Sequence, residues 1–266
     1  MWTNLATLVR YRGLIRSLVA RDLKARYRGS VLGFFWSFVN PLLLLSIYSF
    51  VFTNILVRDD PNDVTRPYEV FMFCGLLPWT WFSSSMLEGS GALISGGNLI
   101  KKVLFPAEIL PIVSVLSNLV HFALGLIILA GFMVWHRHFP DWNELAWFPF
   151  IVLTQLVFTT GLVLLLSALT VHFRDLRDLL SNLLTFWFFA TPIIYSYQME
   201  TVLPYIGLFN WNPFFHLAVS YQEILFFHGP FGHLQWMLVM AGGSVALFLF
   251  GYWVFDRLRD SFAESV

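Results

Sequence analysis

Apolar residues in this chain form long runs that short polar segments separate. A helix of about 20 residues crosses roughly 30 Å of hydrocarbon. Windows of that kind occur six times, at 31–57, 68–92, 109–135, 145–171, 179–198 and 234–255. The pattern predicts an all-α membrane protein with six transmembrane helices. We interpret residues 1–266 as a single transmembrane domain, with the bundle over 31–255.

The composition agrees with a chain that lies mostly in lipid. Hydrophobic residues make up 58% of the sequence and charged residues 12%, against about 25% charged residues in an average soluble domain. The formal net charge is zero. Nothing in this balance indicates nucleic acid binding.

The distribution of Lys and Arg predicts the orientation. Seven of these residues precede the first apolar run, namely Arg10, Arg12, Arg16, Arg21, Lys24, Arg26 and Arg28. With the N-terminus inside, thirteen of the sixteen Lys and Arg residues fall in cytoplasmic segments, and residues 199–233 contain none. Cytoplasmic loops of membrane proteins carry this excess of positive charge. We therefore expect both termini in the cytoplasm, with residues 256–266 as a tail.

The first 30 residues also show a helical apolar pattern. Apolar side chains recur at steps of three and four residues, at Leu8, Tyr11, Ile15, Val19, Leu23 and Tyr27. This spacing puts them on one face of a helix, with the arginines mostly between them. It predicts an amphipathic helix lying flat at the cytoplasmic face. The alternative is a basic flank that only sets topology.

The connection between the second and third spans, residues 90–111, is rich in glycine and ends in proline. It contains a short helix-like piece around Asn98 to Leu104, followed by Pro106. Such a piece between two spans could dock a cytoplasmic partner. Topology alone would also explain Lys101 and Lys102, and spacing does not decide between the two interpretations.

The outer stretch from Thr201 to Gly232 contains an apolar piece, Leu217 to Phe227, that is too short to cross the membrane. Irregular or half-length pieces at membrane depth are tolerated where they pack on protein or line a cavity. We expect two short re-entrant helices at the outer leaflet, before the last span. An amphipathic lid on the outer surface is the alternative.

A search for catalytic motifs finds no Gly-x-x-x-x-Gly-Lys-Ser/Thr loop, so we expect no nucleotide hydrolysis by this chain alone. His136 and His138 flank an arginine, which does not suit a metal site. Glu88 and Glu108 are expected to extend to the cytoplasmic interface from nearby span ends. We expect no catalytic, cofactor or metal site in this chain.

Aromatic residues are the side chains of the apolar segments that could contact a ligand. Flat ring faces suit the C–H faces of sugars. We regard ten of them as candidates for a glycan path: Trp79, Trp81, Phe82, Trp187, Tyr195, Tyr197, Trp211, Phe214, Phe215 and Tyr221. The alternative is an ordinary interfacial belt of Trp and Tyr with lipid-facing Phe.

Four segments, in order along the chain, resemble the permease subunits of ABC exporters for O-antigen, teichoic acid and capsular polysaccharide. They are RDLKARYRGSVLGFFWSFVNP at 21–41, LIKKVLFPAEILP at 99–111, HFRDL at 172–176 and WNPF at 211–214. The resemblance covers essentially the whole chain. Together these motifs are far more specific than any one of them.

The resemblance implies a homodimer in the bacterial inner membrane, each subunit crossing it several times and docked on a separate nucleotide-binding subunit. ATP and Mg would belong to that ATPase dimer, and this chain would bind no cofactor. The cargo would be a polysaccharide on undecaprenyl diphosphate, with O-antigen favoured and teichoic acid or capsule as alternatives.

The resemblance also assigns roles to residues. The ATPase-docking coupling helix would include Asn98, Leu99, Lys101, Lys102, Leu104 and Phe105. The interface helix, Arg12 to Tyr27, would meet membrane lipid and bring Arg21, Lys24, Arg26 and Arg28 to the diphosphate. The short outer helices, about Trp211 to Phe227, would act as a gate. A passage lined by aromatic residues would open between the two copies when the ATPase closes.

Two other classes of protein are compatible with an apolar, aromatic chain. One is an integral-membrane sugar or acyl transferase, which would need an acid or histidine cluster converging on one face. The acidic residues here are spread among loops. The other is a receptor or scaffold.

Overall fold

The computed structural model describes residues 11–26, 28–51, 65–101 and 105–265. Every regular element in these ranges is a helix. The expectation of an all-α membrane protein is confirmed at this level.

Within the described residues, four helices are long and apolar enough to cross a membrane. They are α4 (Tyr68–Ser90), α7 (Ile109–His136), α9 (Phe148–His172), which the short α8 (Trp142–Leu145) precedes, and α13 (Leu234–Ser265). These helices match the predicted windows at 68–92, 109–135, 145–171 and 234–255. Because α13 continues to Ser265, most of the predicted tail is part of the last helix.

The other two windows give shorter helices. In the first, the 3-10 turn η1 (Gly33–Phe35) leads into α3 (Trp36–Phe50), and residues 52–57 lie outside the described part. In the fifth, α10 (Leu176–Phe189) starts before the predicted 179 and stops well before 198. Pro192 has no backbone N–H to donate to the carbonyl oxygen of Phe188, a bond that a longer α10 would need. Fourteen residues rise only about 21 Å, so the predicted bounds of this span were wrong, and six spans stay a prediction.

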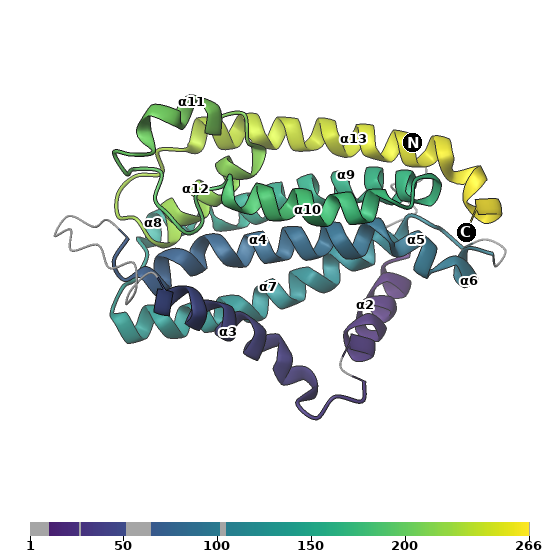
Figure 1. The fold of residues 1–266 in the computed structure, drawn as a ribbon, viewed down its shortest axis with the longest axis horizontal. Helices are drawn as coiled ribbons and strands as arrows, with labels where there is room; N and C mark the ends of the chain where they lie inside the picture. The colour runs from purple at the N-terminus through teal and green to yellow at the C-terminus, as the bar shows by residue number, and fades with distance from the viewer. Residues whose placement is uncertain (1–10, 27, 52–64, 102–104, 266) are drawn as a thin grey trace.

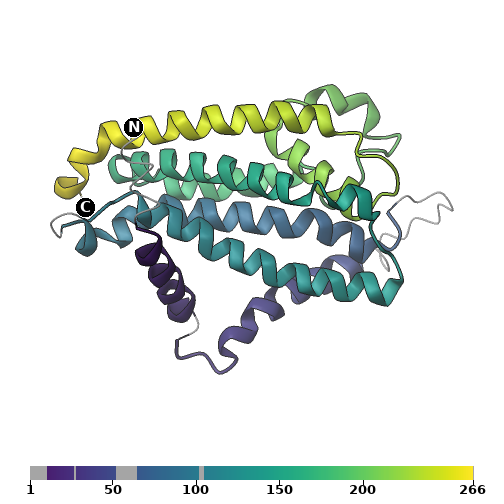
Figure 2. The same ribbon diagram turned by 180° about the vertical axis from the view of Figure 1, so that it is seen from behind.

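The long helices form an elongated bundle. Figures 1 and 2 show α4, α7, α9, α10 and α13 running side by side along the long axis. The helices α2 (Arg12–Arg26) and α3 leave the bundle and form a V beside it. At one end lie α5 (Ala92–Ser95), α6 (Gly97–Ile100) and the last turns of α13. The opposite end holds α8, α11 (Ile206–Phe209) and α12 (Pro213–Leu225).

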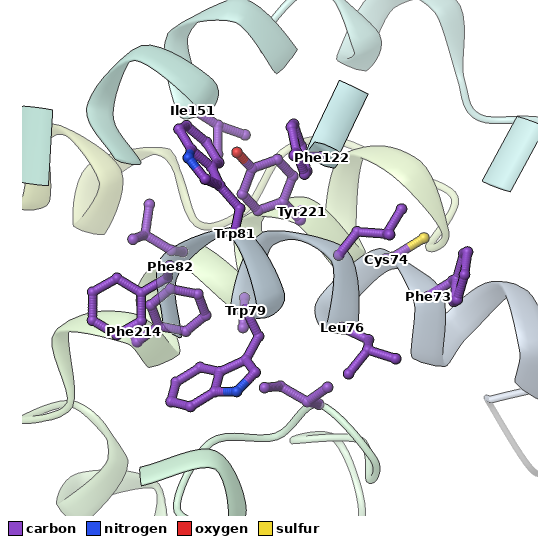
Figure 3. Packing of buried hydrophobic residues seen from close by; sticks show 14 of the residues in the cluster. Phe73, Cys74, Leu76, Trp79, Trp81, Phe82, Phe122, Ile151, Phe214 and Tyr221 are labelled. Carbon is purple, nitrogen blue, oxygen red and sulfur yellow. The ribbon is translucent and has the colours of Figure 1, made fainter. Parts of the chain in front are cut away.

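The helix α4 occupies the centre of the bundle. Apolar side chains surround it, and Val70 through Trp79 are all buried. Figure 3 shows the aromatic packing here, with Trp81 beside Phe122 of α7 and Tyr221 of α12. The rings of Trp81 and Phe122 stack with centroids 5.1 Å apart. A helix that is apolar all round must be covered by neighbours, and α4 follows this rule.

Two glycines let α9 and α13 approach closely. A Cβ added to Gly161 would stand 2.7 Å from the Cα of Phe248, and a Cβ on Gly251 would collide with the carbonyl oxygen of Gly161. Small residues of this kind allow membrane helices to pack backbone to backbone.

In the segment before α13, the helix α12 is buried within the chain. The side chains from Phe214 to Gln222 in α12 are all buried. An external lid is therefore the wrong description of α12, which packs against α4, α9 and α13. The preceding η3 (Leu203–Tyr205) and α11 have no buried residue. Their depth in the membrane stays a prediction.

Candidate functional site

The helix α2 docks on the N-terminal end of α7. Leu18 of α2 is 7% exposed and packs with Ile109 and Val113 of α7. Phe105, which the family resemblance assigns to the coupling helix, packs against this cluster. A helix with an apolar and a basic face is thus present over Arg12–Arg26, as the spacing predicted. Its location at the membrane surface stays a prediction.

The last residue of α2 is tied to two bundle helices. Arg26 donates from Nη1 to Glu88 Oε1 of α4 at 2.8 Å, and its Nη2 bonds the other carboxylate oxygen. Nη1 also reaches Asn118 Oδ1 of α7 at 3.2 Å. Asn118 in turn donates to Glu88 Oε2 at 2.7 Å. We name Arg26, Glu88 and Asn118 the inner clamp, because together they join three helices.

The electrostatics of the clamp favour the ion pair. Burial by itself lowers the pKa of Arg26, but the carboxylates of Glu88 and Asp22 outweigh it and raise this pKa. Asp22 accepts from Arg26 Nε at 3.1 Å within α2. Glu88 closes a two-pronged pair with Arg26, and its position at the cytoplasmic interface stays a prediction. Such bidentate pairs are geometrically specific and strong.

A cavity of about 600 Å³ opens beside the clamp, between α2, the α5–α6 segment and α7. Three arginines and two carboxylates line it, namely Arg21, Arg26, Arg177, Asp22 and Glu88. Arg26 is committed to both acids, whereas Arg21 and Arg177 have no ion pair among the described residues. These two cations, from α2 and the first turn of α10, can therefore attract an anion.

The predicted coupling helix is only partly described. Asn98 and Leu99 lie in α6, Lys101 follows it and is exposed, and Lys102 and Leu104 lie outside the described residues. Together, α5 and α6 form an angular segment that leaves the bundle directly after α4. Asn98 and Leu99 also line the cavity.

The end of α13 packs beside this segment. Glu108 is only 2% exposed, and its Oε2 lies 3.8 Å from Arg259 Nη2. Ser261 Oγ is 3.1 Å from His172 Nε2 at the end of α9. Glu108 is therefore buried, and the expectation that it extends to the interface was wrong.

Six of the ten candidate glycan-path aromatics are packed inside the chain. Trp79, Trp81, Phe82, Phe214, Phe215 and Tyr221 are each at most 5% exposed. Trp79 meets Phe214 edge to face with centroids 4.9 Å apart, and Phe82 stacks on Phe158 at 5.8 Å. Their ring faces are occupied by one another in this conformation.

The other four candidates lie closer to the surface. Trp211 is 87% exposed, between α11 and α12. Trp187, Tyr195 and Tyr197 are half-buried around the end of α10 and the segment after it. The structure thus divides the predicted set into a buried core group and an accessible group.

Asn212 organises the end of the bundle at which α10 ends and α12 begins. Its side chain accepts from the N–H groups of Phe214 and Phe215 and so caps α12. It also donates to Ala190 O at 3.0 Å and Thr191 Oγ1 at 2.9 Å. One amide thereby satisfies backbone groups at the end of α10 and the start of α12.

At the same end, a cluster of polar side chains joins α12 to the residue directly before α13. His216 Nε2 donates to Asn210 O at 3.0 Å, which leaves Nδ1 as the acceptor from His233 Nε2 at 2.9 Å. Glu223 accepts from Tyr197 Oη at 3.0 Å and from the His233 backbone N–H at 2.9 Å. Burial, and then the charge of His216, lower the pKa of His233 to about 4. His233 is therefore neutral at ordinary pH.

Within the described residues, no three side chains of His, Cys, Asp or Glu gather in a way that could hold a metal ion. His136 lies 3.8 Å from Glu69, while His138 Nε2 bonds Phe226 O at 2.7 Å. The two histidines therefore have separate structural partners.

Sequence reasoning missed Asn118, Arg177 and Asn212 as site residues and did not predict the pairing of Glu88 with Arg26. Glu88 and Asn118 are polar residues at matching depth in neighbouring spans, and Arg26 follows an apolar helical face. Polar residues at matching positions in three neighbouring helices were the signal that the sequence offered. Nothing in the sequence indicated that Arg177 would face the same cavity as Arg21.

Comparison with known proteins gives the family. The ABC-2 type transporter family matches residues 13–226. The O-antigen export system permease protein RfbA of Myxococcus xanthus is 41% identical over 97% of both chains, and that of Klebsiella pneumoniae is 30% identical over 94% of both. The polysialic acid transport protein KpsM of Escherichia coli is 24% identical over 79% of this chain and 80% of its own. This chain therefore belongs to the ABC-2 type transporter family.

Proposed function

We propose that this chain is the permease subunit of an ATP-driven exporter that moves O-antigen, carried on undecaprenyl diphosphate, across the bacterial inner membrane. The observation that supports this most strongly is the 41% identity to an O-antigen export permease over 97% of both chains. An apolar helical bundle without a phosphate-binding loop fits a conduit that takes its energy from a partner.

The proposed orientation puts the end with α5 and α6 in the cytoplasm. The basic helix α2, the turn with Arg174 and Arg177, and the end of α13 with Arg257 and Arg259 lie toward that end of the bundle. The excess of cations on cytoplasmic segments supports this direction and the predicted six spans.

The proposed ATPase partner docks on the α5–α6 segment and the residues that follow it. Asn98 and Lys101 are exposed there, and Leu99 is half-buried against the cavity. The segment is short, it follows the central helix α4 without a linker, and it adjoins α2. A push on it would therefore act directly on the core of the bundle.

The proposed passage lies between two copies of the chain. The helices α3 and α10 meet at Tyr48 and Phe188, whose rings are 6.2 Å apart. The side of α10 that faces away from the bundle exposes polar groups at Ser181, Asn182 and Thr185. Exposed polar side chains at membrane depth are expected to face protein or water rather than lipid. This polar face supports a homodimer with a wet passage along α10.

The aromatic part of the proposed path needs accessible rings. Trp187, Tyr195, Tyr197 and Trp211 meet this condition in the present conformation. The six buried rings can contribute only if the bundle opens, and here they serve as packing. We therefore assign the first sugar contacts to the four accessible rings.

The proposed diphosphate contact is made in the inner cavity. Arg21 and Arg177 are its uncommitted cations, while Lys24 and Arg28 are exposed nearby along the chain. Arginine is well suited to phosphate because its planar group can form two parallel bonds. Arg26, by contrast, is engaged with Glu88 and Asp22.

Capsular polysaccharide is the second candidate cargo. KpsM, named for polysialic acid transport, matches 79% of this chain, though at only 24% identity. The two candidates share the same energy source and topology.

A deletion and complementation experiment tests the proposal. In a strain lacking the gene, we expect lipid-linked polymer to accumulate inside and surface polymer to vanish, with the plasmid-borne gene restoring it. Normal surface polymer in the deletion strain would overturn the proposal. Immunoblotting with O-antigen or capsule antibodies identifies the cargo.

A further inference from the structure

We infer that the inner clamp is a mechanical joint, in which Arg26 and Glu88 make α2 and the α5–α6 segment move as one body. These are positioning residues that act on the first span and touch no cargo. The inference rests on the proposed function and adds the route by which the partner's motion reaches α3.

The clamp is placed where such a joint is needed. Glu88 is three residues before Gly91, where α4 ends and the α5–α6 segment begins. Arg26 is the last residue of α2. Asn118 fixes both to α7 through two bonds, 3.2 Å from Arg26 and 2.7 Å to Glu88. The joint therefore connects the end of α4, directly before the proposed docking segment, with the helix that leads into α3.

Beyond the clamp, the chain has little to hold it. Arg28 to Leu32 are all exposed, and Phe35 at the start of α3 is 69% exposed. In α2 itself, Leu18 is the buried side chain, and it lies two turns before Arg26. Arg26 is thus the last fixed point of the described chain before α3. Figure 1 shows the same arrangement, with α2 and α3 meeting outside the bundle.

The pair is built to be rigid. A guanidinium that binds both oxygens of one carboxylate cannot rotate without breaking a bond. The Asn118 amide closes the third side, and its Nδ2 also donates to Ser114 O at 3.0 Å. Loss of Arg26 would leave the half-buried Glu88 without a cation, and loss of Glu88 would leave Arg26 with Asp22 alone; either change is costly.

The test uses the full permease–ATPase complex in lipid vesicles, with transport and ATP hydrolysis measured separately. We compare Arg26→Glu, Glu88→Arg and their double exchange, made together with Asp22→Asn so that no acid faces the new glutamate, with a control. The control is Arg16→Glu, at an exposed arginine of α2 that has no ion pair among the described residues. Each single change should lower transport per ATP by about tenfold, and the double exchange should recover most of it. The control should match the wild type.

A distance measurement covers the case in which a variant assembles poorly. Spin labels are placed at Ser17 of α2 and Ser95 of α5, both exposed, while the native Cys74 is buried. In the wild-type complex, the distribution of distances between the two labels should have one narrow peak with and without ATP. In the Arg26→Gln variant, this distribution should broaden. A narrow distribution in the variant would overturn the joint.

The outcomes separate the two proposals. If the wild-type complex moves no polymer, the proposed function fails, and the label distances still test the joint. If the wild type transports and the single variants transport equally well per ATP, the joint is wrong and the proposed function stands. Failure of the double exchange to recover transport would also contradict a joint based on this pair.

Discussion

Trp187 donates from its indole nitrogen to the Asn212 Oδ1 at 2.6 Å, across the junction of α10 and α12. The same oxygen accepts from the backbone of Phe214 at 3.0 Å. A ring from the fifth predicted span and the cap of the outer helix therefore share one acceptor. This contact fixes the orientation of the Trp187 ring, which is one of the four accessible aromatic residues.

Asn212→Ala should lower the free energy of unfolding by about 1–2 kcal/mol, because it removes the α12 cap and leaves buried groups unpaired. Asn212→Asp keeps the acceptor and should lose less. Asn210→Ala is the control, because only the backbone oxygen of Asn210 is used by His216. Thermal unfolding in detergent measures all three. Equal stability of the Asn212→Ala and Asn210→Ala variants would contradict the assigned role.

Gly251→Val should separate α9 from α13, because any Cβ at this position meets the carbonyl oxygen of Gly161. We expect a loss of about 1–3 kcal/mol or more from overpacking. Gly243→Val is the matched control on the same helix, since nothing lies within 4 Å of its added Cβ. Thermal unfolding and the yield of monodisperse protein are the readouts. The close approach would be refuted if both valine variants behaved alike.

The sequence was sufficient for the four long helices, because uninterrupted apolar runs leave no competing structure. It also predicted α2 from the three and four residue spacing. It failed for the fifth span, where an apolar run continues through Pro192 although the helix ends at Phe189. Hydropathy reports the preference for lipid, whereas the ladder of backbone hydrogen bonds decides where a helix stops.

The site was less accessible to sequence reasoning. A run of aromatic residues does not tell which rings pack together, and only the fold shows that Phe82 is buried while Trp211 is exposed. Arg26 and Glu88 are 62 residues apart. Their pairing depends on how α2 lies across α4 and α7, which no local pattern encodes.

The outer end should lose stability in acid. His233 has its pKa lowered from 6.5 to about 4 in the folded protein, first by burial and then by His216. Because the unfolded chain binds a proton more readily, folding stability should fall as pH drops from about 6.5 toward about 4. Glu223 and Trp236 also face this pair, through the His233 backbone and through the ring of His216. Both nitrogens of a protonated ring would be donors, which removes the acceptor in the pair.

The measurement is the melting temperature between about pH 7 and about pH 5. Between these pH values the melting temperature of the wild type should fall further than that of the His233→Gln variant. The glutamine amide does not titrate and can still donate to His216. His228→Gln changes an exposed histidine and serves as the control. If the wild type and His233→Gln melt with the same pH dependence, the pair does not titrate as described.

The inner cavity should bind phosphate groups through Arg21 and Arg177. Replacing both with Gln should weaken binding of undecaprenyl diphosphate about tenfold or more, since two charged donors are lost. Arg12→Gln with Arg16→Gln removes two exposed arginines from the same helix as a control. Binding to purified protein in nanodiscs is the assay, and an equal loss in both pairs would indicate general attraction to the membrane surface.

The most direct test of the central claim is transport by purified components. The permease is placed in vesicles with or without its ATPase partner, and the movement of lipid-linked polymer is followed after ATP is added. We expect transport only when both subunits and ATP are present. Polymer movement by this chain alone, driven by ATP, would contradict the claim, as would the absence of movement with an active partner bound.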